Sequence, residues 1–99
     1  MKKIRILDCT LRDGGRIINC AFKNQEIKNI SEKLADAGID IIEMGFLRDG
    51  RDVEYLGDTT FFTEVHQITP FLDNKKQNVL YTAFIDYGMC NIDNLDSYD

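Results

Sequence analysis

The chain has 99 residues, of which 43% are hydrophobic and 29% are charged, a balance typical of one globular unit rather than of a disordered or fibrous protein. The formal net charge of −5 argues against a nucleic-acid or anionic-membrane partner. No apolar stretch approaches the roughly 20 residues that cross a bilayer, and the basic N-terminus lacks a secretory signal pattern, so we expect a cytoplasmic protein. Three cysteines without close spacing argue against a disulfide framework and for a reducing compartment.

Residues 4–11 form the first predicted element. The string Ile-Arg-Ile-Leu-Asp-Cys-Thr-Leu is rich in aliphatic and β-branched residues and predicts a buried strand. Asp13-Gly14-Gly15 follows directly and predicts the turn that ends this strand. An ordinary turn would explain these three residues by themselves, and a phosphate-binding loop is the weaker alternative because the fuller glycine motifs are missing.

An amphipathic helix is predicted next. Its apolar positions recur at intervals of three and four residues, at Ile27, Ile30, Leu34 and Ala37. Asn24 is the predicted N-cap, with Glu26 favourable in the first turn, and Gly38 stands where a left-handed C-terminal cap is expected.

A second strand is predicted over residues 39–46. The helix before it provides a crossover of the length that a parallel βαβ unit requires. The charged and glycine-containing stretch 48–58 predicts a long exposed loop, and loops of such length are often functional.

Another helix and a third strand complete the pattern. Helical spacing returns at Phe61, Val65 and Ile68, and Pro70 is expected to interrupt or restart that helix after Thr69. Residues 79–85 predict the third strand.

The alternation of strands and helices predicts an α/β fold with parallel strands. A repeat of nearly 40 residues indicates a TIM (β/α)₈ barrel, of which about three βα units, the N-terminal part, are present. Residues 1–99 are thus expected to be an incomplete barrel domain. A small open α/β sheet that binds a ligand without chemistry is the alternative.

Glu43 is the first candidate functional residue. Alternation along the second strand gives one face with Ile41, Glu43 and Gly45, and a more apolar face with Ile42, Met44 and Phe46. The apolar face is expected to pack under the outer helices, so Glu43 faces the barrel interior, where an unpaired carboxylate is costly. A strand-end carboxylate that reaches solvent is the alternative.

Arg12, immediately after the first strand, is the predicted partner of Glu43. Barrel enzymes assemble their active sites at the carboxyl ends of the strands. The guanidinium suits a bidentate contact with the carboxylate, which would fix its orientation and leave other donors for a substrate.

Asp13, beside Arg12, is the predicted metal ligand. A carboxylate oxygen is a hard ligand of the kind that Mg²⁺ or Mn²⁺ prefers. Gly14 and Gly15 are expected to let the backbone turn sharply and to leave room beside it. A metal and a guanidinium at one place could stabilise the enolate that forms when a carbon–carbon bond next to a carbonyl is made or broken.

Three strings in the chain resemble one enzyme family. They are Leu-Asp-Cys-Thr-Leu-Arg-Asp-Gly-Gly at 7–15, Ala-Gly-Ile-Asp-Ile-Ile-Glu-Met-Gly-Phe at 37–46, and Ile-Asp-Tyr-Gly at 85–88. They resemble the DRE-TIM metallolyase superfamily, with its HMG-CoA lyase-like domain, and most closely its 4-hydroxy-2-oxovalerate aldolase-like branch.

The resemblance implies an aldolase or lyase that works on a 2-oxo acid with a divalent metal, Mn²⁺ or Mg²⁺. It assigns metal binding to Asp13, stabilisation of a pyruvate-type enolate to Arg12, and support of Arg12 to Glu43. It also implies a His-x-His pair and a histidine base, which residues 1–99 do not contain; the position expected for the base reads Gly15-Arg16-Ile17. The expected partner is a small-molecule 2-oxo acid, and a homo-oligomer is left open.

The competing hypothesis is a catalytically inert truncated fragment or an α/β association module, because three strands leave two sheet edges uncovered. Smaller alternatives concern individual residues. His66 is expected to be a partly buried helix residue rather than a ligand, and Cys9 and Cys20 to be small core or loop residues. Asp8 and Thr10 either support the site through hydrogen bonds or form a structural polar layer.

Overall fold

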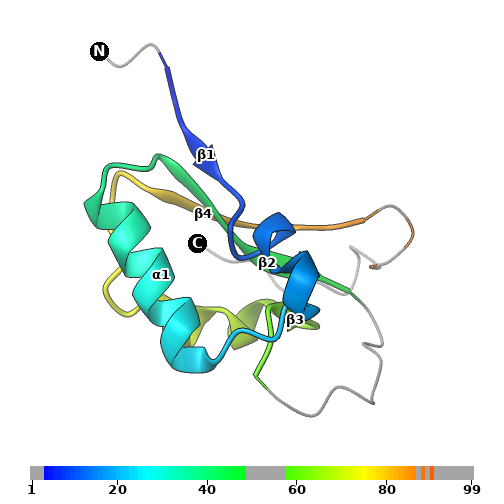
Figure 1. Cartoon of the computed structure of the whole chain (residues 1–99). Helices are drawn as coiled ribbons and strands as arrows, with labels where there is room; N and C mark the ends of the chain where they lie inside the picture. The colour runs from blue at the N-terminus through cyan, green and yellow to red at the C-terminus, as the bar shows by residue number, and fades with distance from the viewer. Residues whose placement is uncertain (1–3, 49–57, 87, 89, 91–99) are drawn as a thin grey trace.

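The computed structural model describes residues 4–48, 58–86, 88 and 90. These residues build a parallel sheet with one long helix on one face (Figure 1). The strands are β1 (Leu7–Asp8), β2 (Ile41–Leu47), β3 (Phe61–Phe62) and β4 (Leu80–Phe84). The predicted α/β class with parallel strands is confirmed, and within the described residues the sheet is open rather than closed into a barrel.

Strand β2 lies at the centre of the sheet. One of its edges pairs with β4 from Ile41 to Phe46. The opposite edge is shared, because β1 pairs with its first residues and β3 pairs with Phe46 and Leu47. The chain therefore leaves the sheet after β1, and β3 later pairs with the part of the same edge of β2 that β1 does not reach.

Strand β1 is shorter and more exposed than predicted. It pairs with β2 only at Leu7 and Asp8, and the side chains of Ile6 and Leu7 are about half exposed. The expected burial of residues 4–11 is wrong for most of the segment, because within the described residues β1 has a paired neighbour on one edge alone. Leu11, which ends the segment, is fully buried.

Helix α1 (Asn24–Asp36) covers the sheet, as predicted, and its C-terminus has the predicted form. Gly38 has φ of 92°, its N–H donates to Ala35 O, and the N–H of Ile39 donates to Leu34 O. This is the Schellman arrangement, in which a left-handed residue lets two terminal carbonyls find donors.

The N-terminus of α1 differs from the prediction. Lys23 is the N-cap, and Asn24 is the first helical residue. The Asn24 N–H donates to the carboxylate of Asp58 at 2.9 Å, and the Lys23 N–H donates to Glu26 at 2.8 Å. The capping carboxylate of Asp58 comes from a distant segment, so inspection of the helix sequence alone could not identify it.

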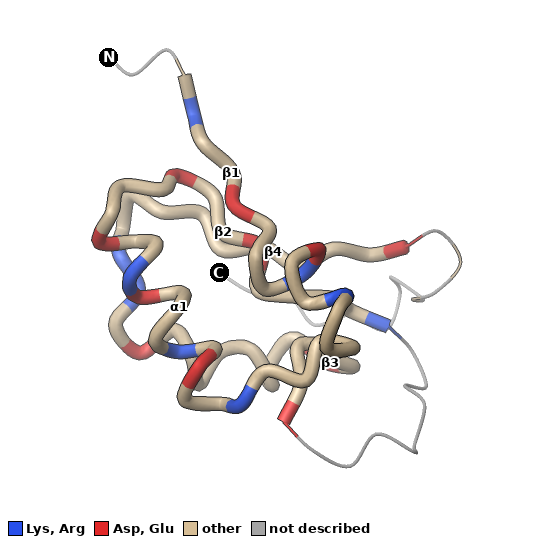
Figure 2. The backbone as a smooth tube through the Cα atoms, in the orientation of Figure 1, with Lys and Arg blue, Asp and Glu red and all other residues tan. Residues whose placement is uncertain are grey.

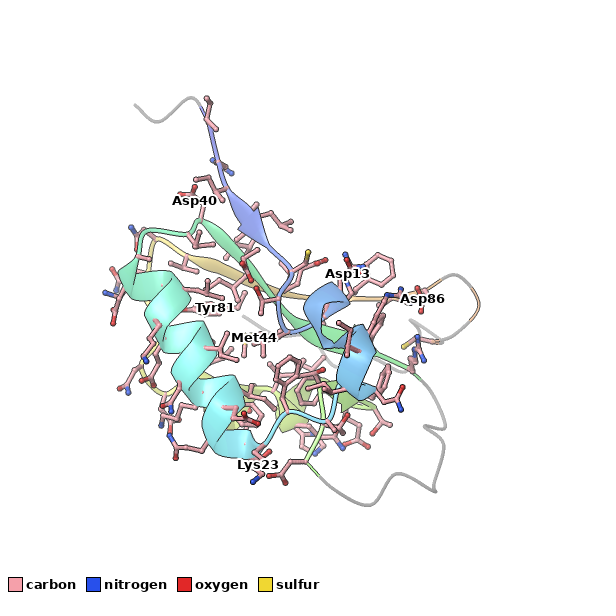
Figure 3. The ribbon with its side chains drawn as sticks, viewed as in Figure 1. Asp13, Lys23, Asp40, Met44, Tyr81 and Asp86 are labelled. Atoms are coloured by element: carbon pink, nitrogen blue, oxygen red, sulfur yellow. The ribbon has the colours of Figure 1, made fainter. Side chains whose placement is uncertain are left out.

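The core lies between α1 and the sheet. Met44 and Tyr81 point from the sheet toward α1 in Figure 3. On α1 the buried positions are Ile27, Ser31 and Ala35, whereas Ala37 follows the helix and is exposed. The buried core comprises Leu11, Phe22, Ile27, Ala35, Ile42, Met44, Leu47, Phe62, Ile68 and Leu72. In the described part of the chain, no helix has the length and apolar composition of a membrane span.

The predicted helix around Phe61, Val65 and Ile68 is wrong. Phe61 belongs to β3, and two short 3₁₀ helices follow, η2 (Val65–Gln67) and η3 (Thr69–Leu72). The main chain on either side of Phe61 bonds to β2, because Thr60 O accepts the Phe46 N–H and Phe62 O accepts the Arg48 N–H. Pro70 lies in the first turn of η3, as the expected restart after Thr69 requires.

Of the predicted loop 48–58, residues 49–57 lie outside the described residues. Arg48 directly follows β2, and Asp58 caps α1.

A bulge at Gly45 changes the face of β2 on which Phe46 lies. Glu43 pairs with Thr82 and Phe46 pairs with Phe84, so three steps on β2 match two steps on β4. Phe46 therefore shares the face of Glu43 and contacts Phe84, and the predicted placement of Phe46 under the helices is wrong. Simple alternation fails here because the bulge adds one residue.

Gly45 is the residue that permits the bulge. Its φ is 153°, and a Cβ built on it would lie 2.8 Å from Thr60 Cβ and 3.0 Å from the Phe62 ring. We predict that Gly45→Ala lowers the free energy of unfolding by about 3 kcal/mol, through overpacking and backbone strain together, in urea unfolding.

Gly38→Ala is the matched control for Gly45→Ala. Gly38 also has positive φ, but a Cβ there would meet no atom within 4 Å, so only the backbone cost of about 1 kcal/mol applies. Equal losses in the two variants would contradict the role given to the close approach of Thr60.

Candidate active site at the carboxyl end of the sheet

Arg12 and Glu43 form the predicted pair. The Arg12 Nε and Nη2 atoms donate to Glu43 Oε1 at 3.1 and 2.9 Å. Glu43 as a residue is 8% exposed, and the Arg12 side chain is 19% exposed, so the pair is largely removed from solvent. The alternative in which Glu43 reaches solvent is therefore wrong. The contact is not bidentate as predicted, because both donors reach the same oxygen.

The charge of Arg12 is secured by its surroundings. Burial lowers the pKa of the guanidinium, but the hydrogen bond and negative charge of Glu43 outweigh burial, and the net effect raises the pKa above its ordinary value. Arg12 is thus a permanent cation at the carboxyl end of the sheet.

Phe84 completes the support of Arg12. The central carbon of the guanidinium lies 4.4 Å from the centre of the Phe84 ring. A cation over an aromatic face is attracted by the ring quadrupole, which adds to the hold of Glu43. Phe84 was not predicted as a site residue, although its place near the end of the third predicted strand was a usable signal.

The turn after β1 is held by one carbonyl. Cys9 O accepts the N–H groups of Arg12, Asp13 and Gly14 at 3.1, 2.8 and 3.1 Å. The 3₁₀ helix η1 (Asp13–Ile18) follows. These three N–H groups are directed at Cys9, so they do not form the phosphate cradle that was the weaker alternative.

The two glycines of the turn differ in their surroundings. A Cβ on Gly14 would make ordinary contacts, the nearest at 3.6 Å, whereas one on Gly15 would lie 2.7 Å from the Phe22 ring. Gly15 therefore serves close packing against Phe22 and Cys20, and the expectation that it leaves room beside Asp13 is wrong.

Asp13 lies beside Arg12 and is accessible. Its side chain is 56% exposed, and its Oδ1 atom is 3.9 Å from Arg12 Nη1. The same Oδ1 accepts a hydrogen bond from Arg16 Nε at 2.9 Å, a contact that the sequence analysis missed. Arg16 lies three positions after Asp13 in η1, the spacing at which side chains of a 3₁₀ helix align.

Asp13 has the donor atoms that a hard cation prefers, but among the described residues it is a single ligand. Its carboxylate oxygens are of the type that Mg²⁺ and Mn²⁺ prefer. Among the described residues, no three His, Cys, Asp or Glu side chains gather closely enough to hold a metal. The described part of the chain can therefore supply Asp13 as one ligand and not a complete metal site.

Other polar candidates do not join this group. Thr10 donates to Asp8 through its N–H at 2.8 Å and its hydroxyl at 3.0 Å, a local arrangement that favours the structural alternative for this pair. The His66 side chain is 67% exposed and lies 2.9 Å from Glu64, so its expected partial burial is wrong. Cys20 is buried, in line with its expected core role.

A second arginine stands at the same end of the sheet. Arg48 Nη2 donates to Asp86 Oδ2 at 2.8 Å, and the two side chains are 29% and 33% exposed. The central carbon of the Arg48 guanidinium lies 4.6 Å from the centre of the Phe46 ring and 4.7 Å from the centre of the Phe61 ring. Arg48 was predicted to lie in a loop and this group was not predicted, although Asp86 directly follows the third predicted strand and Arg48 lies two residues after the second.

The two groups belong to one surface. The Phe46 and Phe84 rings meet edge to face at 6.0 Å, which connects the ring under Arg12 to a ring under Arg48. Figure 3 shows Asp13 and Asp86 at the same end of the sheet, with Asp40, before β2, at the opposite end. Figure 2 shows positive and negative segments close together at this end of the sheet, as it also does along α1.

The chain is similar in sequence to enzymes of known name. The chain is 31% identical over 94 residues to a 2-isopropylmalate synthase of Sulfolobus acidocaldarius, which covers 92% of the chain and 24% of the relative. It is 39% identical over 64 residues to the 2-isopropylmalate synthase of Saccharolobus solfataricus, covering 65% of the chain and 16% of the relative.

A 4-hydroxy-2-oxovalerate aldolase of Carboxydothermus hydrogenoformans is 49% identical over 43 residues, which are 43% of the chain and 13% of the relative. The chain thus spans less than a quarter of the length of each of these relatives. No solved structure gives a significant match. The HMGL-like family model matches residues 3–84, and the chain therefore belongs to the HMGL-like family, whose domain is a TIM barrel.

Proposed function

We propose that the intact protein catalyses metal-assisted aldol or Claisen-type cleavage or condensation of a 2-oxo acid. Arg12 stabilises the enolate, Glu43 orients Arg12, and Asp13 is a ligand of the metal, Mn²⁺ or Mg²⁺. The observation that carries the proposal is the Arg12 guanidinium, held by Glu43 and Phe84 with the Asp13 carboxylate 3.9 Å away.

The chemistry requires negative charge to be stabilised as it develops. Loss of a proton, or of a carbon substituent, next to the carbonyl of a 2-oxo acid leaves an enolate oxygen. A guanidinium already fixed in position stabilises that oxygen without reorganising during the reaction. A divalent metal at Asp13 would polarise the same carbonyl as a Lewis acid.

The relatives support both directions of the reaction. Two of the similar proteins described above are named 2-isopropylmalate synthases and one is named 4-hydroxy-2-oxovalerate aldolase. We therefore keep carbon–carbon bond formation and cleavage together, with a small 2-oxo acid as the substrate. Residues 1–99 would be the first part of a longer barrel domain in a cytoplasmic protein, with self-association left open.

A second candidate applies to residues 1–99 on their own: a catalytically inert association module. The described residues expose Ile4, Ile6 and Leu80 by 75, 52 and 58%, and apolar exposure of this kind favours contact with further polypeptide. The Mn²⁺ titration below separates the candidates, because an inert module needs no metal at Asp13.

Arg12→Lys is the direct test of enolate stabilisation. Lysine keeps the charge but loses the planar fork that Glu43 and Phe84 hold, so we expect pyruvate methyl-proton exchange with Mn²⁺ to slow by about 10²-fold in the full-length protein. NMR in D₂O measures the exchange. Arg5→Lys, an exposed arginine before β1, is the control, and an unchanged rate in Arg12→Lys would refute the assignment.

Asp13→Asn tests the metal ligand. The amide keeps the shape but loses the anionic oxygen, so the affinity for Mn²⁺ should fall by about 10-fold or more in a titration followed by electron paramagnetic resonance. Asp73→Asn, at an exposed carboxylate that lies 3.9 Å from Lys28, is the matched control. Equal affinities in wild type and Asp13→Asn would remove Asp13 from the metal site.

Glu43→Gln tests the orienting role. The amide oxygen can still accept a hydrogen bond, but the charge that holds Arg12 is lost, so we expect kcat for pyruvate exchange to fall by about 10-fold with a smaller change in KM. Glu64→Gln, beside His66, is the control. A change in KM alone would show that Glu43 contributes to substrate binding and not to the transition state.

A further inference from the structure

We propose that Arg48 is a second anion-binding residue of this site and selects reaction partners that carry a carboxylate or phosphate group. The inference rests on the proposed function, because it concerns the molecule that the enolate attacks or from which it is released. Arg12 would stabilise the enolate, and Arg48 would bind the anionic group at the far end of the reaction partner.

Arg48 repeats the construction around Arg12. Each arginine follows the carboxyl end of a strand or the turn after it. Each donates to a carboxylate in the neighbouring strand or just after it, and each guanidinium lies against at least one phenylalanine ring. For Arg12 these are Glu43 and Phe84. For Arg48 they are Asp86, Phe46 and Phe61.

The rings separate the two cations while keeping them on one surface. Phe84 lies under Arg12 and contacts Phe46 edge to face, and Phe46 lies under Arg48. Such an arrangement suits a substrate with two charged ends more than a single anion bound by both guanidiniums. Phe84 is partly exposed and can contact the carbon skeleton of the substrate, whereas Phe46 is buried and supports Arg48 from below.

A purely structural role explains Arg48 less well. The side chains of its ion pair with Asp86 are 29% and 33% exposed. Ion pairs with such exposure contribute only about 0–1 kcal/mol to the stability of the fold. Arg48 Nε is buried and makes no hydrogen bond within the described residues, which opposes folding. A guanidinium held by stacking at the carboxyl end of a strand, with 29% of its side chain exposed, is a preorganised anion site.

The test measures selectivity in the full-length protein with pyruvate and Mn²⁺. Succinic semialdehyde is compared with butyraldehyde, and glyceraldehyde 3-phosphate with glyceraldehyde, as acceptors in condensation. The readout is the ratio of kcat/KM for the anionic acceptor over its neutral analogue. We expect the wild type to favour at least one anionic acceptor, and Arg48→Gln to reduce that ratio by about 10- to 100-fold, mainly through KM.

Arg48→Lys is the second variant, in case the glutamine variant does not fold. It keeps the charge without the planar fork and should give an intermediate ratio. Arg5→Gln, an exposed arginine before β1, is the control and should keep the wild-type ratio. Loss of selectivity in the semialdehyde pair alone identifies a carboxylate partner, and loss in the phosphate pair alone identifies a phosphate partner.

The outcomes distinguish this inference from the proposed function. Wild-type protein that neither exchanges pyruvate protons nor condenses any acceptor overturns both. Pyruvate exchange with a wild-type ratio in Arg48→Gln and Arg48→Lys overturns only the role of Arg48. An equal loss of kcat/KM for anionic and neutral acceptors also overturns it. An Arg48–Asp86 ion pair that only stabilises the structure would affect both classes of acceptor alike.

Discussion

The close approach of Gly45 to Thr60 is the constraint on which the arrangement of the sheet depends. A side chain at position 45 would displace the Thr60 main chain, and with it the strand β3 that pairs with the end of β2. The bulge at this point also turns Phe46 toward Glu43 and Leu47 toward the helical layer. One glycine thus sets which side chains reach the carboxyl end of the sheet.

The arginines at that end show how a fold can hold a cation ready for an anionic ligand. A carboxylate in the neighbouring strand or just after it fixes the direction of the guanidinium, and an aromatic ring beneath the guanidinium limits its motion. Neither contact covers the whole guanidinium. Because Glu43 and the phenylalanine rings belong to strands, which are more rigid than loops, the guanidinium donors are held in fixed positions.

The carboxylates of the site have different surroundings and therefore suit different tasks. Glu43 is buried and bound to Arg12, so it is suited to positioning. Asp13 is more than half exposed and bonded to Arg16 through one oxygen, so its carboxylate remains accessible to a cation. An exposed ion pair of this type is weak, so the metal proposed for Asp13 would displace Arg16 at little cost.

The sequence by itself determined the α/β class, the parallel order of the strands, the end of α1 at Gly38 and the pairing of Arg12 with Glu43, because hydrophobic period, turn residues and strand ends are local signals. Tertiary structure alone decided the rest. The cap from Asp58, the placement of Phe46 and the group around Arg48 depend on segments that meet only after folding, and a single bulged residue reverses the face of every position after it.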